Sequence, residues 1–549
     1  MKKRRLWSCL TLGLLVVLTV TQCGPTPAPA ATQPPAAAEQ PTSVPQPTEV
    51  PPTAVPTPNV FVYAHGTTFP NIDPAVSYSN DSVVTSNCYE TLVFYNPPGS
   101  DEVLSPQLAT SWESNDDATE WVFHIRQGAK FHNGDPLNAE AVKAAIDNTM
   151  ELGAGSAYIW DPVQEIEAVD DYTVKFKLSY AAPLDLIASS GYGAWIYNAQ
   201  VYKEKGTEWL NEGHCAGTGP YTIESRERGS RLFMTRNEDY WGGWHEGQFD
   251  KIVFEISEDE TILQNKISAG TADFTYNVPP DNLAMLDADP NIVVYTNPSF
   301  QDLTGLLNTQ KPPLDNKLVR QALSYSVPYE QFIEGVLQGR GVQSHGPVPA
   351  GMWGQSDSLF QYTFDLDKAK ELLAEAGYPD GGFDLLYTFA TGDADEEQLG
   401  EVWKAELSKL GINLTVQAMN WESQWDLAKS DPQRAQDVFV MYWWPDYISP
   451  YSFLYGMWHS QEEINLNLSY YDNPEFDDMI DTANALAGSD REAAAQMFID
   501  AQEILIDDAV SLFFYDVANV HLARSDIKGY VDNPAYPHVV FVYQLTRQK

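Results

Sequence analysis

The segment Trp443-Trp444-Pro445-Asp446-Tyr447 decides how we interpret this sequence. Three aromatic side chains flank one carboxylate, and the ring of Pro445 stiffens the backbone between them. The apolar run Val438-Phe439-Val440-Met441 precedes the segment, and such a run predicts a buried strand that ends at the edge of a cavity. Aromatic walls with one fixed negative charge suit a small ligand that carries a positive group. The alternative is a core aromatic cluster beside a surface aspartate.

Residues 1–58 differ in composition from everything that follows them. Met1-Lys2-Lys3-Arg4-Arg5 precedes an apolar run and then Thr21-Gln22-Cys23-Gly24, which predicts a secretory signal peptide over residues 1–22. Cys23 resembles the lipobox cysteine of bacterial lipoproteins, which is acylated and becomes the new N-terminus. Gln22 departs from that pattern, because a small residue is usual there; ordinary signal cleavage nearby is the alternative.

Residues 23–58 consist mainly of Pro, Ala, Thr, Gln and Val. Such a segment cannot bury a core, so we expect an extended, disordered tether. A lipid, a long tether and then a folded body imply a protein held at a membrane on the extracytoplasmic side, working in water.

Length and charge narrow the function classes. A chain of 549 residues is too long for a single core, so two or more domains are expected. The formal net charge of -44 argues against binding to nucleic acid, whose phosphates would be repelled. It is compatible with a cationic ligand, although a well-hydrated acidic surface is the simpler explanation.

Four cysteines are present, and two of them lie beyond the signal and the lipid site. Cys88 and Cys215 remain in an exported and oxidising setting, where a disulfide is expected. The sequence has no CxxC or Cys/His spacing typical of zinc sites. We therefore expect no metal and no cofactor.

Hydrophobic patterns after the tether alternate between strands and helices. Strands are predicted over residues 60–63, 121–126, 173–178 and 412–416. Asn138 is expected to cap a helix that runs through Thr149, and Asp365 one that ends at Gly377; another helix is predicted over 397–410. Helix followed by strand repeats through the second half, which argues for an α/β fold.

Nine short motifs follow one another in a fixed order. They are Leu108-Ala109 with Trp112, Trp121 to Arg126, the run from Phe131 to Glu140, Gly217-Thr218-Gly219-Pro220-Tyr221, Arg236-Asn237 with Asp239-Tyr240-Trp241, Gly270 with Asp273, Val319-Arg320-Gln321-Ala322-Leu323, the run from Asp367 to Tyr378, and Asn473-Pro474-Glu475-Phe476-Asp477. Each motif is weak alone. As an ordered set covering nearly the whole body, they resemble the extracellular solute-binding proteins of the dipeptide, oligopeptide and nickel class, which serve ATP-driven importers.

The resemblance implies a periplasmic-binding-protein-like fold of two lobes, with the ligand closed between them. The first lobe is expected at residues 60–300, with an extra subdomain near 106–212, and the chain returns to it at 512–549. The second lobe is expected at 301–511. Two hinge crossings are expected at 302–309 and 512–516. Closure of two lobes about such hinges is a known way in which binding proteins switch between conformations.

The resemblance also implies a site. Peptide-binding members hold the ligand's α-ammonium with an aspartate in a tryptophan-x-x-aspartate segment, and Trp443 and Asp446 match those positions. Tyr442 replaces the usual glycine, and Trp444-Pro445 is bulkier than common. A desolvated carboxylate pairs well with an ammonium in a dry cleft. We expect Asp446, Trp443, Trp444 and Tyr447 to contact the ligand.

Other candidates for ligand contacts in the cleft lie after the first strand or are tryptophans of the second half. Thr68 and Phe69 are expected ligand contacts beside the aspartate segment. Further candidates are Thr67, residues 78–80, Trp421 and Trp425. For the two tryptophans, a place in the core or on the surface is the alternative.

We expect a lipid-anchored, monomeric receptor that captures a short peptide and delivers it to a membrane permease. An oligosaccharide receptor and a nickel-chelate receptor are alternatives within the same class. An extracellular hydrolase is the rival class, but no GxSxG, HExxH or Walker pattern is present and the nine histidines are scattered. We therefore expect a binding protein and no enzyme.

Overall fold

The computed structural model describes residues 58–77, 81–462 and 464–548. The expected signal peptide, the lipid site Cys23, the tether up to residue 57 and the candidates at 78–80 lie outside the described residues. Within the described part, no helix combines the length and the apolar character that a membrane crossing needs.

The largest sheet has eleven strands and mixes parallel with antiparallel pairs. In spatial order its strands are β15 (Asn413–Met419), β14 (Asp384–Ala390), β16 (Val438–Trp443), β12 (Ile292–Leu307), β17 (Ser511–Arg524), β11 (Phe274–Thr275), β1 (Val60–His65), β10 (Lys251–Ile256), β9 (Arg231–Arg236) and β8 (Tyr221–Glu227), with β13 (Gly341–Val342) beside β17. A smaller sheet has the order β4 (Ala109–Ser114), β5 (Glu120–Ile125), β7 (Thr173–Leu178) and β6 (Val163–Asp170). Two short hairpins pair β2 (Val93–Tyr95) with β3 (Leu104–Pro106), and β18 (Ile527–Lys528) with β19 (Thr546–Arg547).

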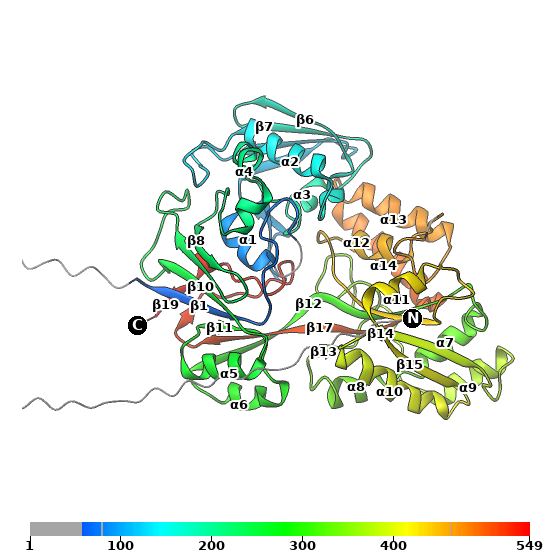
Figure 1. Ribbon diagram of the computed structural model, residues 1–549. Helices are drawn as coiled ribbons and strands as arrows, with labels where there is room; N and C mark the ends of the chain where they lie inside the picture. Colours follow the sequence, from blue (N-terminus) through cyan, green and yellow to red (C-terminus); the bar gives the residue numbers. More distant parts are fainter. Residues whose placement is uncertain (1–57, 78–80, 463, 549) are drawn as a thin grey trace, which may run out of the picture. The chain divides into compact units, whose positions relative to one another are not determined.

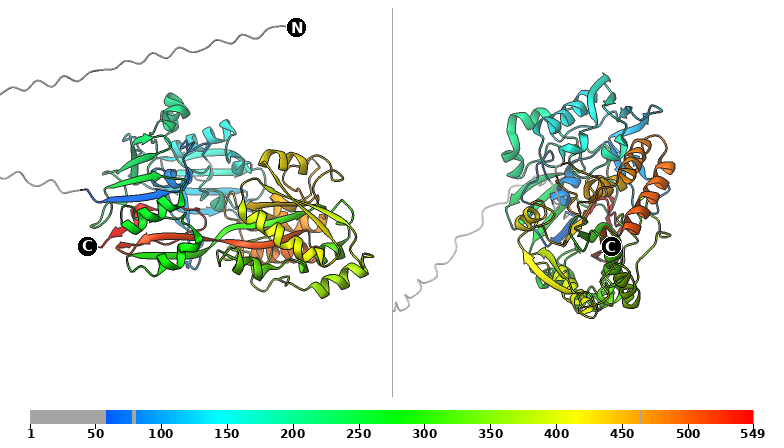
Figure 2. Two further views of the ribbon diagram at one scale, coloured as in Figure 1. Left: turned by 60° about the horizontal axis from the view of Figure 1, so that its bottom comes forward. Right: turned by 90° about the vertical axis from the view of Figure 1, so that its right-hand side faces the viewer.

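The long strands β12 and β17 connect two groups of strands (Figure 1). They are antiparallel neighbours from residue 292 to 306; β12 also pairs with β16 at one end, and β17 pairs with β11 at the other. In the left view of Figure 2 the red strand β17 runs from one group to the other. This arrangement confirms the two-lobed α/β fold with two crossing segments. Because each crossing strand extends into both lobes, the exact lobe boundaries stay a prediction.

The first lobe contains the β1 half of the large sheet and the four-stranded sheet. Its helices are α1 (Ser82–Cys88), α2 (Ala139–Leu152), α3 (Leu184–Ile187), α4 (Ala199–Asn211), α5 (Glu260–Ala269) and α6 (Leu283–Asp287). Helix α2 packs on β6 and β7, and α5 packs on β1. The Asn138 side chain accepts a hydrogen bond from the Ala141 amide, as the sequence predicted.

The second lobe places its remaining helices around β14, β15 and β16. These are α7 (Lys317–Tyr325), α8 (Tyr329–Gly335), α9 (Leu366–Glu375), α10 (Ala394–Ser408), α11 (Trp421–Ala428), α12 (Pro450–Trp458), α13 (Pro474–Leu486) and α14 (Arg491–Asp508). Asp365 caps α9, as predicted. Helix α10 begins three residues earlier than the predicted residue 397, because Asp393 caps it by accepting from the Glu396 amide.

A disulfide joins Cys88 at the end of α1 to Cys215 in the segment before β8. The adjoining motif Gly217-Thr218-Gly219 lies directly against this cysteine. A Cβ atom added at Gly217 would come within 2.1 Å of the Cys88 carbonyl oxygen. Glycine is therefore required here for close approach of two backbones, and the motif is structural, not a phosphate loop.

Candidate functional site

Strand β16 ends at Trp443, and the aspartate segment begins there. The first four residues of the strand are buried, which fits the apolar run in the sequence. Trp443 lies opposite Asp302 of β12, so the segment leaves the sheet where the crossing strands change register. Ser449 then caps α12.

The pairing of β12 with β17 shifts register at two places, and the larger shift lies between Pro298 and Asp302. Pro298 lies opposite Ala518 and Asp302 lies opposite Asp516, so Ser299, Phe300 and Gln301 face the single residue Val517. The Ser299 hydroxyl donates to the Val517 carbonyl at 2.7 Å and accepts from the Gln301 amide at 3.2 Å. This bulge turns the three residues out of the regular ladder.

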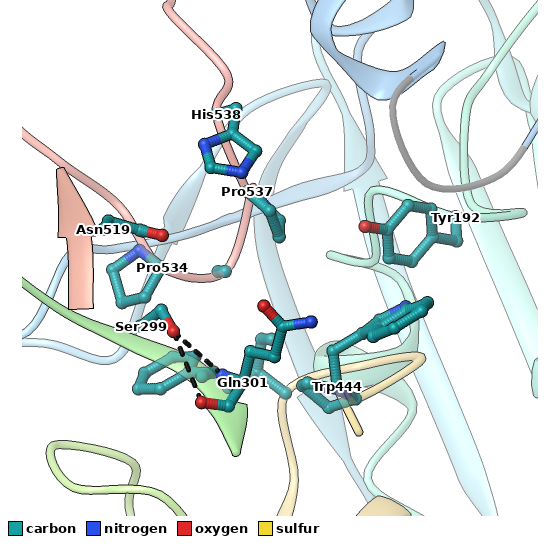
Figure 3. Close-up of a pocket in the computed structure, with 12 residues that line it drawn as sticks. Tyr192, Ser299, Gln301, Trp444, Asn519, Pro534, Pro537 and His538 are labelled. Carbon is teal, nitrogen blue, oxygen red and sulfur yellow. Dashed lines mark hydrogen bonds between the residues drawn. The ribbon is translucent and has the colours of Figure 1, made fainter. Parts of the chain in front are cut away.

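A cavity of about 110 Å³, here called the hinge cavity, lies at this bulge (Figure 3). Both lobes contribute to its lining: Tyr192, Ser299, Phe300, Gln301, Trp444, Pro445, Ile448, Asn519, Pro534, Ala535, Pro537 and His538. A second cavity of about 170 Å³ shares Gln301, Asn519 and His538 with it and adds Glu260, Tyr276 and Arg340.

A larger cavity of about 650 Å³, here called the tyrosine cavity, is lined by Trp443, Asp446 and Tyr447 of the aspartate segment. It is lined by Tyr158, Tyr180, Tyr447, Tyr451 and Tyr455, with Trp443, His459, Asp161, Asp446 and Asp481 among the rest. Residues near 158–187 and residues 443–485 face each other across it, so it lies between the subdomain of the first lobe and the second lobe. Lysine and arginine are absent from its described lining.

The backbone of Asp446 is held from both sides. Its carbonyl accepts a hydrogen bond from the Ser190 hydroxyl at 2.6 Å, and its amide donates to the Ser452 hydroxyl at 3.1 Å. Burial, and after it the charge of Asp446, raises the pKa of the Tyr192 phenol well above its usual range. Tyr192 lines the hinge cavity, so the Asp446 charge reaches one residue of that cavity.

The structure thus brings four of the six predicted ligand contacts to inter-lobe cavities. Trp443, Asp446 and Tyr447 line the tyrosine cavity, and Trp444 lines the hinge cavity.

The first-strand candidates are placed differently. Phe69 is buried, with its ring 4.7 Å from that of His65 and 5.6 Å from that of Phe254, and Thr68 is exposed. Neither residue lines the three cavities described above. The rings of Trp421 and Trp425 pack against each other in a tilted arrangement, and each contacts the ring of Phe439 edge to face. The ligand roles of all these residues stay predictions.

Several residues of the site carry no recognisable signal in the sequence. Ser299, Gln301 and Asn519 carry no motif, and they meet because of the register between strands that are far apart in the chain. His538 looked like one of many scattered histidines. The fold places it beside His521.

Comparison with known proteins identifies the family. Residues 103–465 match the family described as "Bacterial extracellular solute-binding proteins, family 5 Middle". This chain belongs to that family. The extracellular solute-binding family confirms the resemblance seen in the motifs.

Relatives of this family 5 protein include two curated bacterial proteins. The probable D,D-dipeptide-binding periplasmic protein DdpA of Escherichia coli K12 is 31% identical over 488 residues, covering 87% of this chain and 92% of the relative. Heme-binding protein A of Haemophilus influenzae is 28% identical, covering 87% of this chain and 90% of the relative. Both are named for binding, not for catalysis.

Two solved structures support the fold assignment. HbpA2 from Haemophilus parasuis superposes with a TM-score of 0.80 at 25% identity, covering 89% of this chain and 100% of that one. DppA from Helicobacter pylori, in complex with the peptide STSA, has a TM-score of 0.72 at 26% identity, covering 89% and 98%.

The two lobes of this family 5 protein are joined by an ion pair away from the crossing strands. The Arg491 guanidinium at the start of α14 donates to both carboxylate oxygens of Asp185 in α3, at 2.9 Å each. Trp112 also donates to Asp185, at 3.3 Å, and the Asp185 side chain is only 8% exposed. Hydrogen bonds from Arg491, Trp112 and the Leu186 amide to this buried carboxylate hold α3 of the first lobe against the start of α14 in the second.

Two buried acids face each other on the crossing strands. Asp302 and Asp516 are register partners, and both are almost fully buried. Burial, with the nearby Asp516 carboxylate as a second cause, raises the pKa of Asp302 well above its ordinary value. Burial raises the pKa of Asp516 to about 6, although hydrogen bonds from Ser344 and the Ala350 amide oppose that rise.

Proposed function

We propose that this protein is the solute-binding component of an ATP-driven importer and that it captures a short peptide between its lobes. The observation that carries the proposal is the position of Asp446, whose carboxylate belongs to a tyrosine-lined inter-lobe cavity without lysine or arginine in its described lining. An ammonium group is attracted both by the carboxylate and by the faces of aromatic rings. The α-ammonium of a peptide fits this environment, and relatives named for dipeptides support the choice.

Closure would couple ligand capture to delivery. The attraction between an ammonium group and the Asp446 carboxylate becomes stronger when closure of the lobes excludes water from the cleft. Ligand and closure therefore stabilise each other. The closed form, held by contacts such as Arg491 with Asp185, is then the form presented to a membrane permease.

Thermal shift and calorimetry against a panel of peptides test the proposal. The panel contains L-Ala-L-Ala, D-Ala-D-Ala, tri- and tetrapeptides, and the N-acetylated form of each. A ligand at 100 times its Kd should stabilise the protein by about 2.7 kcal/mol, and N-acetylation should abolish the shift. Equal shifts with free and acetylated peptides would contradict ammonium capture by Asp446.

The variant Asp446→Asn gives the matching genetic test. It keeps the side-chain shape and removes the charge, so peptide affinity should fall at least tenfold, as expected for loss of a charge-assisted bond. Asp116→Asn is the matched control, because Asp116 is exposed and lines none of the three cavities. Unchanged affinity in Asp446→Asn would refute the assigned role.

An oligosaccharide is the second candidate, and one observation favours it. Tyr451 and Tyr455 stack 4.9 Å apart and both line the tyrosine cavity, and tyrosine faces suit sugar rings. Cello- and manno-oligosaccharides therefore form a second arm of the same screen, and a nickel chelate forms a third. A shift with sugars alone would replace the peptide proposal.

We also propose that the protein is a monomer anchored to the membrane by a lipid on Cys23, outside the cytoplasm. The support is the charged and apolar leader before Cys23 and the Pro-rich stretch after it. Cys23→Ala should release the protein from the membrane fraction into the soluble extracytoplasmic fraction. Continued membrane association of this variant would reject the lipid anchor.

A further inference from the structure

Three histidines that are far apart in the sequence lie close together beside the hinge cavity. His65 ends β1, His521 lies in β17, and His538 lies in the C-terminal segment. His65 and His521 are fully buried. His538 is only partly buried, and it lines both the hinge cavity and the adjoining cavity.

A chain of hydrogen bonds leads from a carboxylate to His538. The Asp532 carboxylate lies 3.2 Å from Nδ1 of His521. The Tyr530 hydroxyl donates to the same carboxylate at 3.1 Å and lies 2.9 Å from that nitrogen. On the other side of the ring, Nε2 of His521 lies 3.1 Å from Nδ1 of His538.

Chemistry fixes the direction of this chain. The Tyr530 hydroxyl has a single proton, which it donates to the Asp532 carboxylate, so its oxygen accepts a hydrogen bond from Nδ1–H of His521. In a neutral imidazole the other nitrogen is then an acceptor. Nε2 of His521 therefore accepts from Nδ1–H of His538. As a result, Nε2 of His538 carries a lone pair and no proton.

The surroundings hold the His538 ring in place and neutral. The ring stacks on Tyr276 with centroids 4.1 Å apart, and the His538 carbonyl accepts from the Tyr63 hydroxyl at 2.8 Å. Burial lowers the pKa of His538 well below its usual value, and the neighbouring His521 and His65 add to this. A second proton on the ring is therefore disfavoured.

The free edge of the ring faces the cavity. In Figure 3 the His538 imidazole projects into the cavity from one side, and the Gln301 amide projects toward it from the other. Since Nδ1 is used by His521, the nitrogen left for a ligand is Nε2.

We propose that His538 is a ligand-selecting residue, because its unprotonated Nε2 accepts a hydrogen bond from an N–H or O–H group of the solute bound at the hinge cavity. Asp532 and His521 are positioning residues that keep this tautomer. For a peptide the donor is a backbone amide N–H. The inference rests on the proposed function to the extent that a solute enters this cleft. A solute group that only accepts, such as a carbonyl, would meet a lone pair and be rejected.

The tautomer is measured first, on the full protein without ligand. Proton–nitrogen correlation spectra of protein with ¹⁵N-labelled histidine distinguish protonated from bare ring nitrogens. His538 should show a bare Nε2. The variant Asp532→Asn should reverse the chain, because the side-chain amide that it introduces can donate to the Tyr530 oxygen, whose hydroxyl then donates to Nδ1 of His521 and leaves Nε2–H on His538. A protonated Nε2 on His538 in the wild-type protein would overturn the inference.

Binding is measured second, with L-Ala-L-Ala and D-Ala-D-Ala and with their analogues methylated at the peptide nitrogen. In the wild type, methylation should raise Kd about tenfold or more, since it removes the donor and leaves a buried acceptor unpaired. His538→Phe should raise Kd for the parent peptides and abolish the difference between parent and analogue. Asp532→Asn should also raise Kd, whereas the exposed Asp116→Asn should not.

The outcomes separate this inference from the proposed function. If Asp446→Asn weakens peptide binding while His538→Phe and Asp532→Asn do not, the function stands and the role of His538 is wrong. If no peptide binds, the peptide proposal fails, and the sugar and nickel-chelate arms are examined for a change in the His538 nitrogen signal. A His538 signal that none of these solutes changes would overturn the inference as well.

Discussion

The facing acids Asp302 and Asp516 predict an unusual dependence of stability on pH. The perturbation is Asp516→Asn. The amide oxygen of asparagine can accept from the Ala350 amide, and its nitrogen can donate to the Ser344 hydroxyl, so both hydrogen bonds of the carboxylate have a replacement. The variant therefore resembles the protonated acid and removes only the titration.

The magnitude follows from the raised pKa. A rise from the ordinary value of 3.8 to about 6 corresponds to ~3 kcal/mol, at about 1.4 kcal/mol per pH unit. Because the folded protein holds this proton more tightly than the unfolded chain, the wild type loses stability as pH rises from about 4 through about 6. The variant keeps the stability that the wild type loses as pH rises. Asp302 acts in the same direction, since Asp516 is one cause of its raised pKa.

Urea unfolding followed by tryptophan fluorescence, at pH values from 4 to 8, measures the effect. The unfolding free energy of Asp516→Asn minus that of the wild type should increase by ~3 kcal/mol across this range. Asp116→Asn changes an exposed acid and should give a nearly constant difference. If the Asp516→Asn curve runs parallel to the wild type within about 1 kcal/mol, burial does not penalise this carboxylate and the reasoning is refuted.

Three further outcomes are expected, each measured by urea unfolding. Asn138→Ala removes the cap of α2 and should cost about 1 kcal/mol; no loss would mean that the cap contributes little. Arg491→Met leaves the buried Asp185 carboxylate without its guanidinium and should cost ~3 kcal/mol. Adding Asp185→Asn should recover part of that loss, and strict additivity of the two changes would show that the pair is not coupled. Replacing Cys88 and Cys215 by alanine should cost about 2–5 kcal/mol relative to the oxidised protein, and the reduced wild type should match the variant.

Local elements could be predicted from the sequence because their signals are local. Strand β7 has the predicted bounds, since alternation of apolar and polar residues over 173–178 matches a half-buried strand. Asn138 and Asp365 cap the predicted helices. A short polar side chain directly before an apolar periodic run is a typical helix cap, because its oxygen can accept from a free amide of the first turn. The prediction for the start of α10 was wrong by three residues, because Asp393 caps the helix ahead of the acidic residues of its first turn.

The candidate site could be predicted only in part, and the limit is physical. The aspartate segment was found because its residues are contiguous. Ser299, Gln301, Asn519 and His538 meet only through the register of β12 against β17, and a shift of one residue would change which side chains face the cavity. Phe69 follows a strand and looked like a cleft residue, yet it packs between His65 and Phe254. Apolar residues after a strand serve a core and a cleft equally well.

The bulge of Ser299, Phe300 and Gln301 against Val517 has a consequence for how one architecture serves different cargoes. The two strands pair on both sides of it, with one further register shift between Leu303 and Thr304, so the lobes can swing without any strand exchanging partners. Contacts away from the bulge, such as Arg491 with Asp185, add to the closure energy that the solute supplies, so the size and chemistry of the solute can differ from one relative to the next. This sharing of the closure energy gives a physical reason why proteins of this shape carry names as different as dipeptide-binding and heme-binding.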